Sequence, residues 1–315
     1  MRQFTTSSLL FCLVIIASMW EKGNSQVWNY RNGEPDGPEK WYVKYPHCGG
    51  VMQSPIDIVS SQAIYSPALT SLNFSDYLMS KGDNFTLSNR GGRMVQLVYS
   101  GTPIYLRGGG LPTAYKLVQL HFHWGANQYL GSEHYMDGKS FPMEVHLVHR
   151  QVQLANFSVA QELPYGLAVV GFFFQMSERN NTKYDQLLKY FHNIVKPDTA
   201  TEVESFQLTD LLPANLDSMD YYRYFGSLTT PPCYESVIWT VSTSYIPISE
   251  SQINLFRNLQ NENLNSFVNG YRPIQDSNHR IVTTTLQDYL SSASLTHIQL
   301  HFLLICVFII ALYIY

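Results

Sequence analysis

The chain has 315 residues, of which 45% are hydrophobic and 14% are charged, and its formal net charge at pH 7 is -4. This composition can supply one large hydrophobic core and excludes a wholly disordered chain. The slightly acidic balance, together with the lack of any cluster of lysine and arginine, argues against nucleic acid as a partner.

The first segment is an apolar run at residues 9–17 that follows Arg2. A membrane-spanning helix needs about 20 apolar residues, so this run is too short to cross a bilayer. Its length is typical of the hydrophobic region of a secretory signal peptide, and residues 23–25 offer small side chains for cleavage before Gln26. We therefore expect residues 1–25 to be a signal peptide.

Cysteine usage and sequons agree with an exported chain. Cys12 lies in the expected signal peptide and Cys306 near the C-terminus, so the mature domain keeps Cys48 and Cys233. An even pair in an exported protein is typical of one disulfide, although two buried free thiols have the same count. Four sequons for N-glycosylation are consistent with the same route. They begin at Asn73, Asn84, Asn156 and Asn180.

Short extended segments dominate the predicted secondary structure. Alternating or continuous apolar patterns predict strands at residues 94–99, 117–124, 143–150, 167–175 and 236–243. The run at 167–175 is almost wholly apolar, which indicates a buried strand near the centre of a sheet. Helices are predicted at 184–193 and 251–259. These elements predict one mixed α/β domain in which strands predominate.

Three histidines lie on two of the predicted strands. His121 and His123 occur in the run Gln-Leu-His-Phe-His-Trp-Gly, and His146 occurs in Met-Glu-Val-His-Leu-Val-His. Successive side chains of a strand alternate between faces, so His121 and His123 share a face and lie about 7 Å apart. A neighbouring strand can bring His146 to the same cavity. Three neutral imidazoles with a fourth position open are the ligands of a catalytic zinc ion.

The residues beside these histidines strengthen the metal hypothesis, because a lone histidine on an apolar strand is more often a hydrogen-bonded core residue. Gln119 lies on the face of His121 and Glu144 on the face of His146, so each can accept the ring proton of a ligand. A His-x-His pair also opens the cupin metal motif. That motif needs a glutamate four or five residues later, and residues 126–128 are Ala-Asn-Gln.

The C-terminal segment at residues 291–315 begins with small residues, continues with a polar spacer to His301 and ends in an apolar tail. This order is the pattern of a glycosylphosphatidylinositol (GPI) anchor signal. We expect the segment to be removed on maturation, with the lipid attached at Ser291 or Ser292. A short transmembrane anchor is the alternative, and the lack of Lys or Arg after the tail weighs against it.

Ten short runs along the chain together resemble the alpha-class carbonic anhydrases. They follow the family order from about residue 28 to about residue 285, so the resemblance covers nearly the whole expected domain at residues 26–290. The runs lie at 29–30, 37–39, 53–58 (Gln-Ser-Pro-Ile-Asp-Ile), 119–125, 132–134 (Ser-Glu-His), 144–149, 166–169, 228–232 (Leu-Thr-Thr-Pro-Pro), 237–239 and 271–273.

The resemblance implies a fold. It predicts one domain with a large, mostly antiparallel, twisted central sheet, helices on the surface and zinc at the bottom of a central conical cavity. It also implies cis peptide bonds before Pro55 and Pro232. A disulfide between Cys48 and Cys233 is implied as well, and it would hold the turn at residues 229–230.

The resemblance also implies a reaction, the reversible hydration of carbon dioxide to bicarbonate and a proton. Zinc on the three histidines would lower the pKa of its water to about 7, an effect for which carbonic anhydrase is the standard example. Thr229 would accept a hydrogen bond from the resulting hydroxide and donate to Glu133. Without the resemblance, Glu133 would be taken for a solvated loop residue. Tyr30 is expected in the water network of the site.

An apolar pocket for carbon dioxide is implied beside the zinc. A small dry pocket suits a substrate with no charge and no hydrogen-bond donor. Taken singly, the pocket side chains cannot be told from core residues. Phe157 is expected nearer the mouth, and Thr230 on the polar side. The apolar wall is Val148, Val169, Leu228 and Trp239.

One departure concerns the histidine that relays protons in fast members of the family, usually within Asn-Gly-His. The stretch at residues 87–97 is one residue longer here, and the relay position falls on Gly92 or Arg93. Glycine has no side chain to carry a proton, and arginine stays charged at all relevant pH values. We therefore expect the hydration step to be intact and the maximum rate to be limited by proton export.

Three functions are compatible with the sequence. The first is an active, GPI-anchored carbonic anhydrase at the outer cell surface, with carbon dioxide and bicarbonate as its substrates. The second is a catalytically silent binding domain of the same fold, but such domains typically lack a ligating histidine, and this chain keeps all three. The third is a zinc esterase in which the same hydroxide attacks small activated esters.

Overall fold

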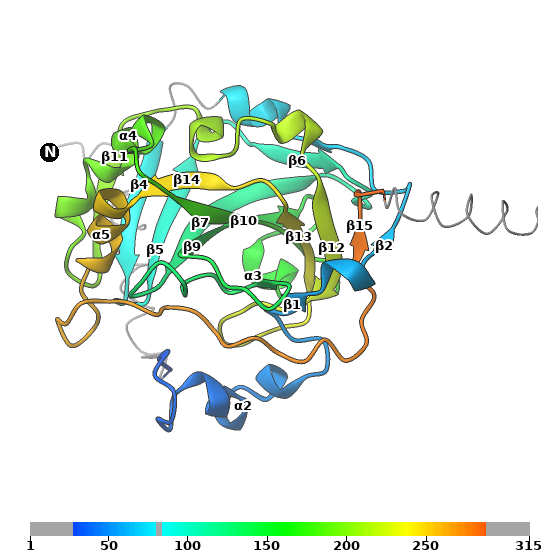
Figure 1. The fold of residues 1–315 in the computed structure, drawn as a ribbon, viewed down its shortest axis with the longest axis horizontal. Coiled ribbons are helices and arrows are strands. Elements are labelled where there is room, and N and C mark those ends of the chain that lie inside the picture. Colours follow the sequence, from blue (N-terminus) through cyan, green and yellow to red (C-terminus); the bar gives the residue numbers. More distant parts are fainter. Residues whose placement is uncertain (1–27, 80–83, 288–315) are drawn as a thin grey trace, which may run out of the picture.

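A twisted sheet of thirteen strands runs through the described part of the molecule, residues 28–79 and 84–287 of a computed structural model (Figure 1). Ten of these strands form one continuous path. In order they are β11 (Thr199–Val203), β4 (Asn84–Arg90), β5 (Met94–Ser100), β7 (Tyr115–Trp124), β9 (Met143–Gln151), β10 (Leu167–Ser177), β13 (Val237–Ser242), β12 (Tyr221–Gly226), β15 (Thr283–Thr284) and β2 (Ile64–Tyr65).

Shorter strands complete the sheet and form a second, two-stranded one. Strand β14 (Ile246–Ser249) pairs with β10, and β6 (Tyr105–Gly108) pairs with β7. Strand β3 (Leu72–Asn73) in turn pairs with β6. A separate parallel pair joins β1 (Asp57–Ile58) to β8 (Tyr135–Met136). In the large sheet only the β10–β13, β10–β14 and β15–β2 pairs of the described chain are parallel. The predicted mostly antiparallel sheet is therefore confirmed.

All five predicted strands are present, as β5, β7, β9, β10 and β13. The apolar run predicted to be central is β10, which lies between β9 and β13 and has its first eight residues buried. An apolar strand in this position buries both of its faces, which is why its sequence shows no alternation.

Helices are short and lie at the surface, with α4 and α5 near the β11 end of the sheet and α2 below it (Figure 1). The α-helices are α2 (Trp41–Lys44), α3 (Phe157–Ala160), α4 (Asp185–Leu188) and α5 (Glu250–Arg257). The 3-10 helices are η2 (Pro38–Lys40), η3 (Pro46–Gly49), η4 (Ser60–Gln62), η5 (Ser75–Met79), η6 (Thr182–Tyr184), η7 (Phe191–Asn193), η8 (Leu208–Leu211) and η9 (Leu216–Ser218).

The two predicted helices have different outcomes. The helix predicted at 251–259 is α5, and a capping box between Ser249 and Gln252 sets its start. The continuous helix predicted at 184–193 is wrong, because η6, α4 and η7 divide that stretch. Residues 190–193 are Tyr-Phe-His-Asn, which are poor helix formers, and the chain tightens there into a 3-10 turn.

The alternation of β7 and β9 separates a hydrophobic core from the site. Leu120, Phe122 and Leu147 point into the largest buried apolar cluster. Their neighbours His121 and His146 project from the opposite face of the sheet. Each strand therefore anchors itself in the core with one set of residues and presents ligand atoms with the other.

Several covalent and surface features of the expected domain can be compared with the structure. A disulfide joins Cys48 to Cys233, with a Cα–Cα distance of 4.9 Å, so the alternative of two free thiols is wrong. The peptide bonds before Pro55 and Pro232 are cis, as the resemblance implied. The sequon residues Asn73, Asn156 and Asn180 are exposed, and Asn84 is the first residue of β4.

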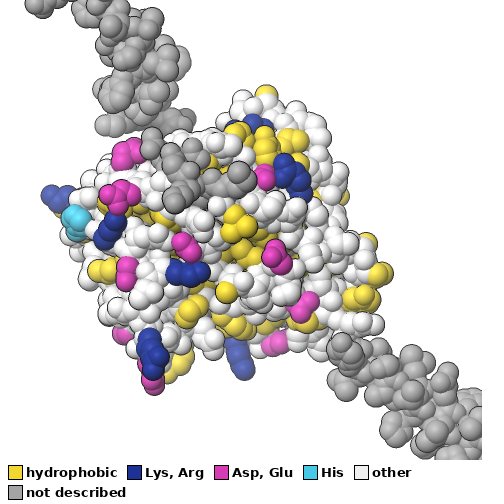
Figure 2. Space-filling view, turned by 90° about the horizontal axis from the view of Figure 1, so that it is seen from above, with side chains coloured by type: hydrophobic (Ala, Val, Ile, Leu, Met, Phe, Trp, Pro, Cys, Tyr) yellow, Lys and Arg dark blue, Asp and Glu magenta, His cyan; other side chains and the backbone are white. Residues whose placement is uncertain are grey.

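The segments predicted at the two chain ends lie outside the described residues. These are the signal peptide at 1–25, the anchor signal at 291–315 and its attachment site at Ser291 or Ser292. Within 28–79 and 84–287, no helix combines the length and the apolar character needed to cross a bilayer. Lys and Arg side chains are interspersed with Asp and Glu over the face seen in Figure 2.

Candidate metal centre

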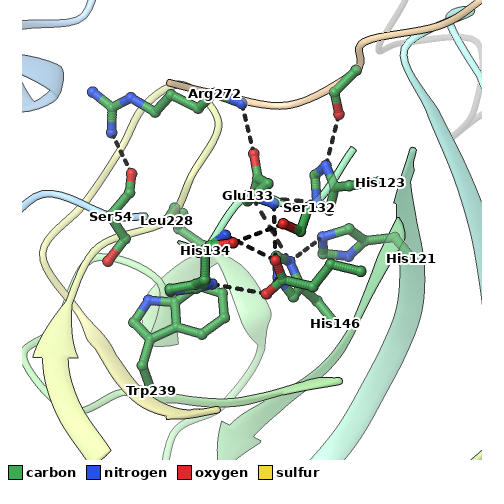
Figure 3. A network of polar contacts seen from close by, with 12 residues as sticks. Ser54, His121, His123, Ser132, Glu133, His134, His146, Leu228, Trp239 and Arg272 are labelled. Atoms are coloured by element: carbon green, nitrogen blue, oxygen red, sulfur yellow. Dashed lines mark hydrogen bonds and ion pairs between the residues drawn. The ribbon is translucent and has the colours of Figure 1, made fainter. Parts of the chain in front are cut away.

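Three imidazoles converge where β7 and β9 lie side by side (Figure 3). His121 is directly opposite His146 in the antiparallel ladder, and His123 is opposite Glu144. One nitrogen from each of the three rings lies within 4.8 Å of the other two. His121 Nε2 and His146 Nδ1 are 3.2 Å apart. The predicted ligand set is therefore brought together by register alone.

The outward nitrogen of each ring faces a hydrogen-bond acceptor. Gln119 Oε1 lies 3.0 Å from His121 Nδ1, and Glu144 Oε1 lies 2.8 Å from His146 Nε2, as the sequence predicted. The acceptor for His123 Nδ1 is the backbone carbonyl of Gly270, at 2.7 Å. These acceptors hold each ring proton on the outer nitrogen, so three lone pairs point inward.

This arrangement of lone pairs fits a bound metal ion. His123 Nε2 and Glu133 Oε2 are buried, 3.3 Å apart and without a hydrogen-bond partner in the described chain. Buried polar atoms normally have partners, so the inward nitrogen of His123 fits a bound cation, whereas Glu133 Oε2 can accept a hydrogen bond. Imidazole nitrogen suits zinc and several other transition metals. His121, His123 and His146 could therefore hold a metal.

Burial keeps the imidazoles of His121 and His123 in the neutral form that binds metals. Desolvation, followed by repulsion from His123 and His146, lowers the pKa of His121 well below its ordinary value. Desolvation also lowers the pKa of His123, although Glu133 opposes this. Both rings are consequently unprotonated at neutral pH, and metal binding need not displace a proton from them.

Glu144 organises the surroundings of His146 and was predicted to do so, but its link to His134 was not foreseen. Its Oε1 atom accepts from His146 and from His134 Nδ1, both at 2.8 Å. Its Oε2 atom accepts the backbone N–H groups of Glu133 and His134. Burial alone would raise the pKa of Glu144, but the His134 and His146 imidazoles outweigh it and hold that pKa below its ordinary value.

A second group of ligand-type side chains, His134, Glu144 and His146, lies beside the first. Its nitrogens are already used, because both rings donate to the same Glu144 oxygen. His134 Nε2 is hydrogen-bonded to Tyr224 Oη at 2.6 Å. We interpret this group as the support of the three-histidine site. A lone His134 in a loop gives no sequence signal for such a role.

Glu133 is fully buried, with 0% of its surface exposed, so the alternative of a solvated loop residue is wrong. The Arg272 backbone N–H donates to its Oε1 atom at 2.9 Å, which leaves Oε2 directed at the histidines (Figure 3). Thr229 is buried and lies two residues before the cis peptide bond of Pro231 and Pro232. No hydrogen bond joins Thr229 to Glu133 in the described residues, so their pairing stays a proposal.

The apolar residues predicted to form a pocket belong to one cluster. Val169 on β10 is opposite Val148 on β9 and Trp239 on β13, and all three are buried. Leu228 and Phe157 are partly buried and pack against that cluster. The Trp239 ring lies 4.8 Å from the His146 ring, between centroids. An apolar wall therefore adjoins the candidate metal ligands.

The polar side of the predicted pocket lies in the turn closed by the disulfide. Thr230 is half-buried, and its carbonyl accepts the N–H of Cys233 at 2.9 Å. This contact holds the turn together beside Leu228. A contact between Thr230 and a substrate stays a prediction.

Gly92 and Arg93 occupy the turn between β4 and β5, at the predicted relay position. Gly92 has φ +62°, and a Cβ atom added there would lie 2.4 Å from the Asn261 Cα atom. Any side chain at this position is therefore excluded. The Arg93 guanidinium lies over the Trp28 ring, 5.0 Å from its centroid. Of the two positions, therefore, only the one occupied by Arg93 could carry a relay side chain.

Tyr30 and Arg93 line the same pocket, which has a volume of about 300 Å³. The Tyr30 hydroxyl is buried and has no hydrogen-bond partner among the described residues. Burial, followed by the charge of Glu133, raises the pKa of Tyr30 well above its ordinary value. Its hydroxyl therefore stays protonated, and its place in a water network stays a prediction.

Comparisons with known proteins agree with these observations. Residues 36–286 match the family described as eukaryotic-type carbonic anhydrase. The chain is 39% identical over 268 residues to carbonic anhydrase 7 of Mus musculus, which covers 82% of this chain and 97% of the relative. It is 34% identical over 287 residues to carbonic anhydrase 6 of Homo sapiens, covering 88% and 91%. It is 34% identical over 270 residues to carbonic anhydrase 12 of Homo sapiens, covering 83% and 74%.

Proposed function

Because the chain belongs to the eukaryotic-type carbonic anhydrase family, we propose that it is a zinc enzyme that hydrates carbon dioxide reversibly at the outer cell surface. The observation that carries the proposal is that three imidazoles direct their lone pairs to one point. The outer N–H group of each ring donates to Gln119, Glu144 or the Gly270 carbonyl. Three histidines with an open fourth position match the ligands of catalytic zinc.

Zinc bound to His121, His123 and His146 would lower the pKa of a water molecule to about 7 and so supply hydroxide at neutral pH, the effect for which carbonic anhydrase is the standard example. The chain's contribution is to hold the ligands before the ion arrives. Gln119 and Glu144 lock the rings of His121 and His146 against rotation, and burial keeps the rings of His121 and His123 neutral. Such support typically changes metal affinity or activity by about 10- to 100-fold.

We assign orientation of the nucleophile to Thr229 and Glu133. Glu133 Oε2 is buried, faces the histidines and has no partner among the described residues, so it can accept the Thr229 hydroxyl proton. The Thr229 oxygen then has only lone pairs left for the site. It would accept a hydrogen bond from a group in the fourth position and disfavour ligands that cannot donate one.

Val148, Val169, Leu228 and Trp239, with Phe157 nearer the mouth, would form the wall against which carbon dioxide rests. An uncharged substrate without donors loses little on leaving water, whereas water itself gains no hydrogen bonds from this wall. The wall therefore favours the substrate over competing water. Thr230 would serve the polar side, where the bicarbonate product carries charge.

We also propose that the protein is exported and held to the membrane by a GPI anchor. A disulfide between Cys48 and Cys233 and exposed sequons at Asn73, Asn156 and Asn180 support an oxidising, glycosylating route. Phosphatidylinositol-specific phospholipase C should release active protein from intact cells. Protein that remains on the membrane after effective digestion, and still carries Tyr315 by mass spectrometry, would identify a transmembrane anchor instead.

The experiment that tests the proposed reaction is a metal analysis combined with carbon dioxide hydration by the purified protein. Equimolar zinc and rapid hydration are expected, and removal of zinc by a chelator should abolish the activity. Hydrolysis of a small activated ester in the same preparation is expected as a weaker side activity. A protein that binds zinc and hydrates nothing would be the silent binding domain.

A further inference from the structure

We propose that Arg272 is a positioning residue that holds Glu133 and the disulfide-bonded turn of Thr229 in one arrangement. The inference rests on the proposed function, because it concerns the two residues assigned to orient the nucleophile. It arises from contacts that connect three distant parts of the chain through one buried side chain.

The first contact is made by the backbone of Arg272. Its N–H donates to Glu133 Oε1 at 2.9 Å (Figure 3). This hydrogen bond occupies one carboxylate oxygen and leaves the other, Oε2, facing the histidines. The choice of oxygen therefore depends on where the backbone of Arg272 is held.

The guanidinium of Arg272 fixes that backbone to the N-terminal part of the domain. Nη2 donates to the Cys48 carbonyl at 3.0 Å, and Nη1 donates to Ser54 O at 2.9 Å and to Gln53 Oε1 at 2.8 Å. The side chain also lies over the Trp41 ring, at 5.5 Å from its centroid. Arg272 is only 2% exposed, and these contacts replace the hydration of its two terminal nitrogens, Nη1 and Nη2.

Both ends of the disulfide are reached from this one residue. Cys48 is contacted directly, and Cys233 is reached through Gln53, whose Nε2 atom donates to the Cys233 carbonyl at 3.2 Å. Cys233 ends the turn that begins at Thr229, and its N–H bonds back to Thr230. If Arg272 were displaced, Glu133 and the turn from Thr229 to Cys233 would lose their common anchor. The two could then shift relative to each other.

The positive charge of Arg272 is retained in this position. Burial lowers the pKa of Arg272 to about 10, but that value still leaves the group charged at neutral pH. A charged, planar donor can satisfy several carbonyls at fixed angles, which a lysine cannot reproduce. An arginine therefore suits this junction better than a lysine.

The test replaces Arg272 by Met and by Lys and uses Arg223→Met as a matched control. Arg223 is also a buried arginine, 6% exposed, but it donates to Gly109 O and Thr240 Oγ1 and contacts neither Glu133 nor the disulfide. All rates are measured in saturating imidazole buffer, so that proton export does not limit kcat. For Arg272→Met we then expect zinc content and KM to be unchanged and kcat to fall about tenfold, as for other supporting residues of a metal site. Arg272→Lys should recover part of the loss.

The control should separate positioning from stability. Both Met variants should lower the Tm, but Arg223→Met should keep its kcat. An Arg272→Met protein that loses stability and retains full kcat would overturn the inference. Equal losses of kcat in both variants would overturn it as well.

A second measurement does not need activity. Hydrogen exchange of the metal-free protein should show faster exchange at residues 229–235 and 45–54 in Arg272→Met, and at neither segment in Arg223→Met. Unchanged exchange at 229–235 would contradict the coupling. If the wild-type protein failed to hydrate carbon dioxide while this pattern appeared, the proposed function would fail and the positioning role would stand.

Breaking the disulfide should act on the same element. Replacing Cys48 and Cys233 together by Ser should lower kcat, and adding Arg272→Met to that variant should lower it by less than the two separate effects combined. Fully additive losses would mean that Arg272 and the disulfide act on different parts of the site, against the proposal.

Discussion

The metal centre and the turn at residues 91–93, here called the rim, are built in different ways. At the centre, three histidines project from two paired strands, and each outer ring nitrogen has a buried acceptor. At the rim, Gly92 and Arg93 lie in a turn, and Arg93 packs on the Trp28 ring. The centre thus brings together the candidate metal ligands and their acceptors, whereas the turn at residues 91–93 offers no imidazole as a proton relay.

This difference between the centre and the rim indicates which step should limit the turnover rate. Rigid strands keep ligand atoms in position at the centre, so the chemical step has no missing part. A turn tolerates changes of length and residue, and here it has lost the imidazole expected from the family resemblance. We therefore expect ordinary chemistry at the metal and slow proton transfer at the rim.

The largest effect is expected at the centre, from His121→Ala. Loss of one of three protein ligands should remove most of the zinc and lower hydration by at least about 100-fold. Elemental analysis and hydration rates measure the two losses. The control is His149→Gln, which alters a buried histidine on the opposite face of β9 and should retain zinc. Full zinc occupancy and activity in His121→Ala would refute the ligand assignment.

A smaller effect is expected from Glu144→Gln, which keeps the size of the side chain. The glutamine amide would place a donor against the N–H groups of His134, His146 and the loop at 133–134, all of which now bond to Glu144. Zinc affinity should fall about 10- to 100-fold. Competition with a chelator of known affinity measures the change. An unchanged affinity would mean that His146 needs no charged partner.

The third prediction separates burial from metal chemistry and uses the pKa of His149, which burial lowers from 6.5 to about 4. Between these values the unfolded chain binds a proton that the folded chain does not, so stability falls as pH decreases through this window. At pH 5 the loss is about 2 kcal/mol. His149→Gln should remove this part of the pH dependence, as measured by urea unfolding at pH 7 and pH 5. An equal slope in both proteins would contradict the lowered pKa.

The smallest effect is expected at the rim, from Arg93→His. An imidazole with a pKa of about 6.5 can take and release a proton near neutral pH, so turnover at low buffer should rise several-fold. The unmodified enzyme should instead speed up with added imidazole buffer. High turnover that is independent of buffer would show that another group or a water chain carries the proton.

Gly92→His serves as the contrasting variant for the rim. Its Cβ atom would meet the Asn261 backbone at 2.4 Å, so the protein should be destabilised and gain no turnover. A higher turnover in Gly92→His and none in Arg93→His would show that Gly92, and not Arg93, occupies the relay position.

Local sequence patterns determined much of this protein. The two-residue repeat of strands predicted that His121 and His123 share a face, and it also placed Gln119 and Glu144 beside their ligands. Apolar runs predicted five of the strands, including the buried β10. These inferences succeed because each depends on residues close together in the chain and on a fixed strand geometry.

Other features were decided only by the tertiary structure. The acceptor for His123 is the carbonyl of Gly270, and a backbone carbonyl has no side-chain signature in a sequence. The link from His134 to Glu144 joins a loop to a strand, and the junction at Arg272 joins segments far apart in the chain. The exclusion of side chains at Gly92 depends on the packing of Asn261. Long-range contacts of this kind arise from the packing of the whole domain, which no local pattern records.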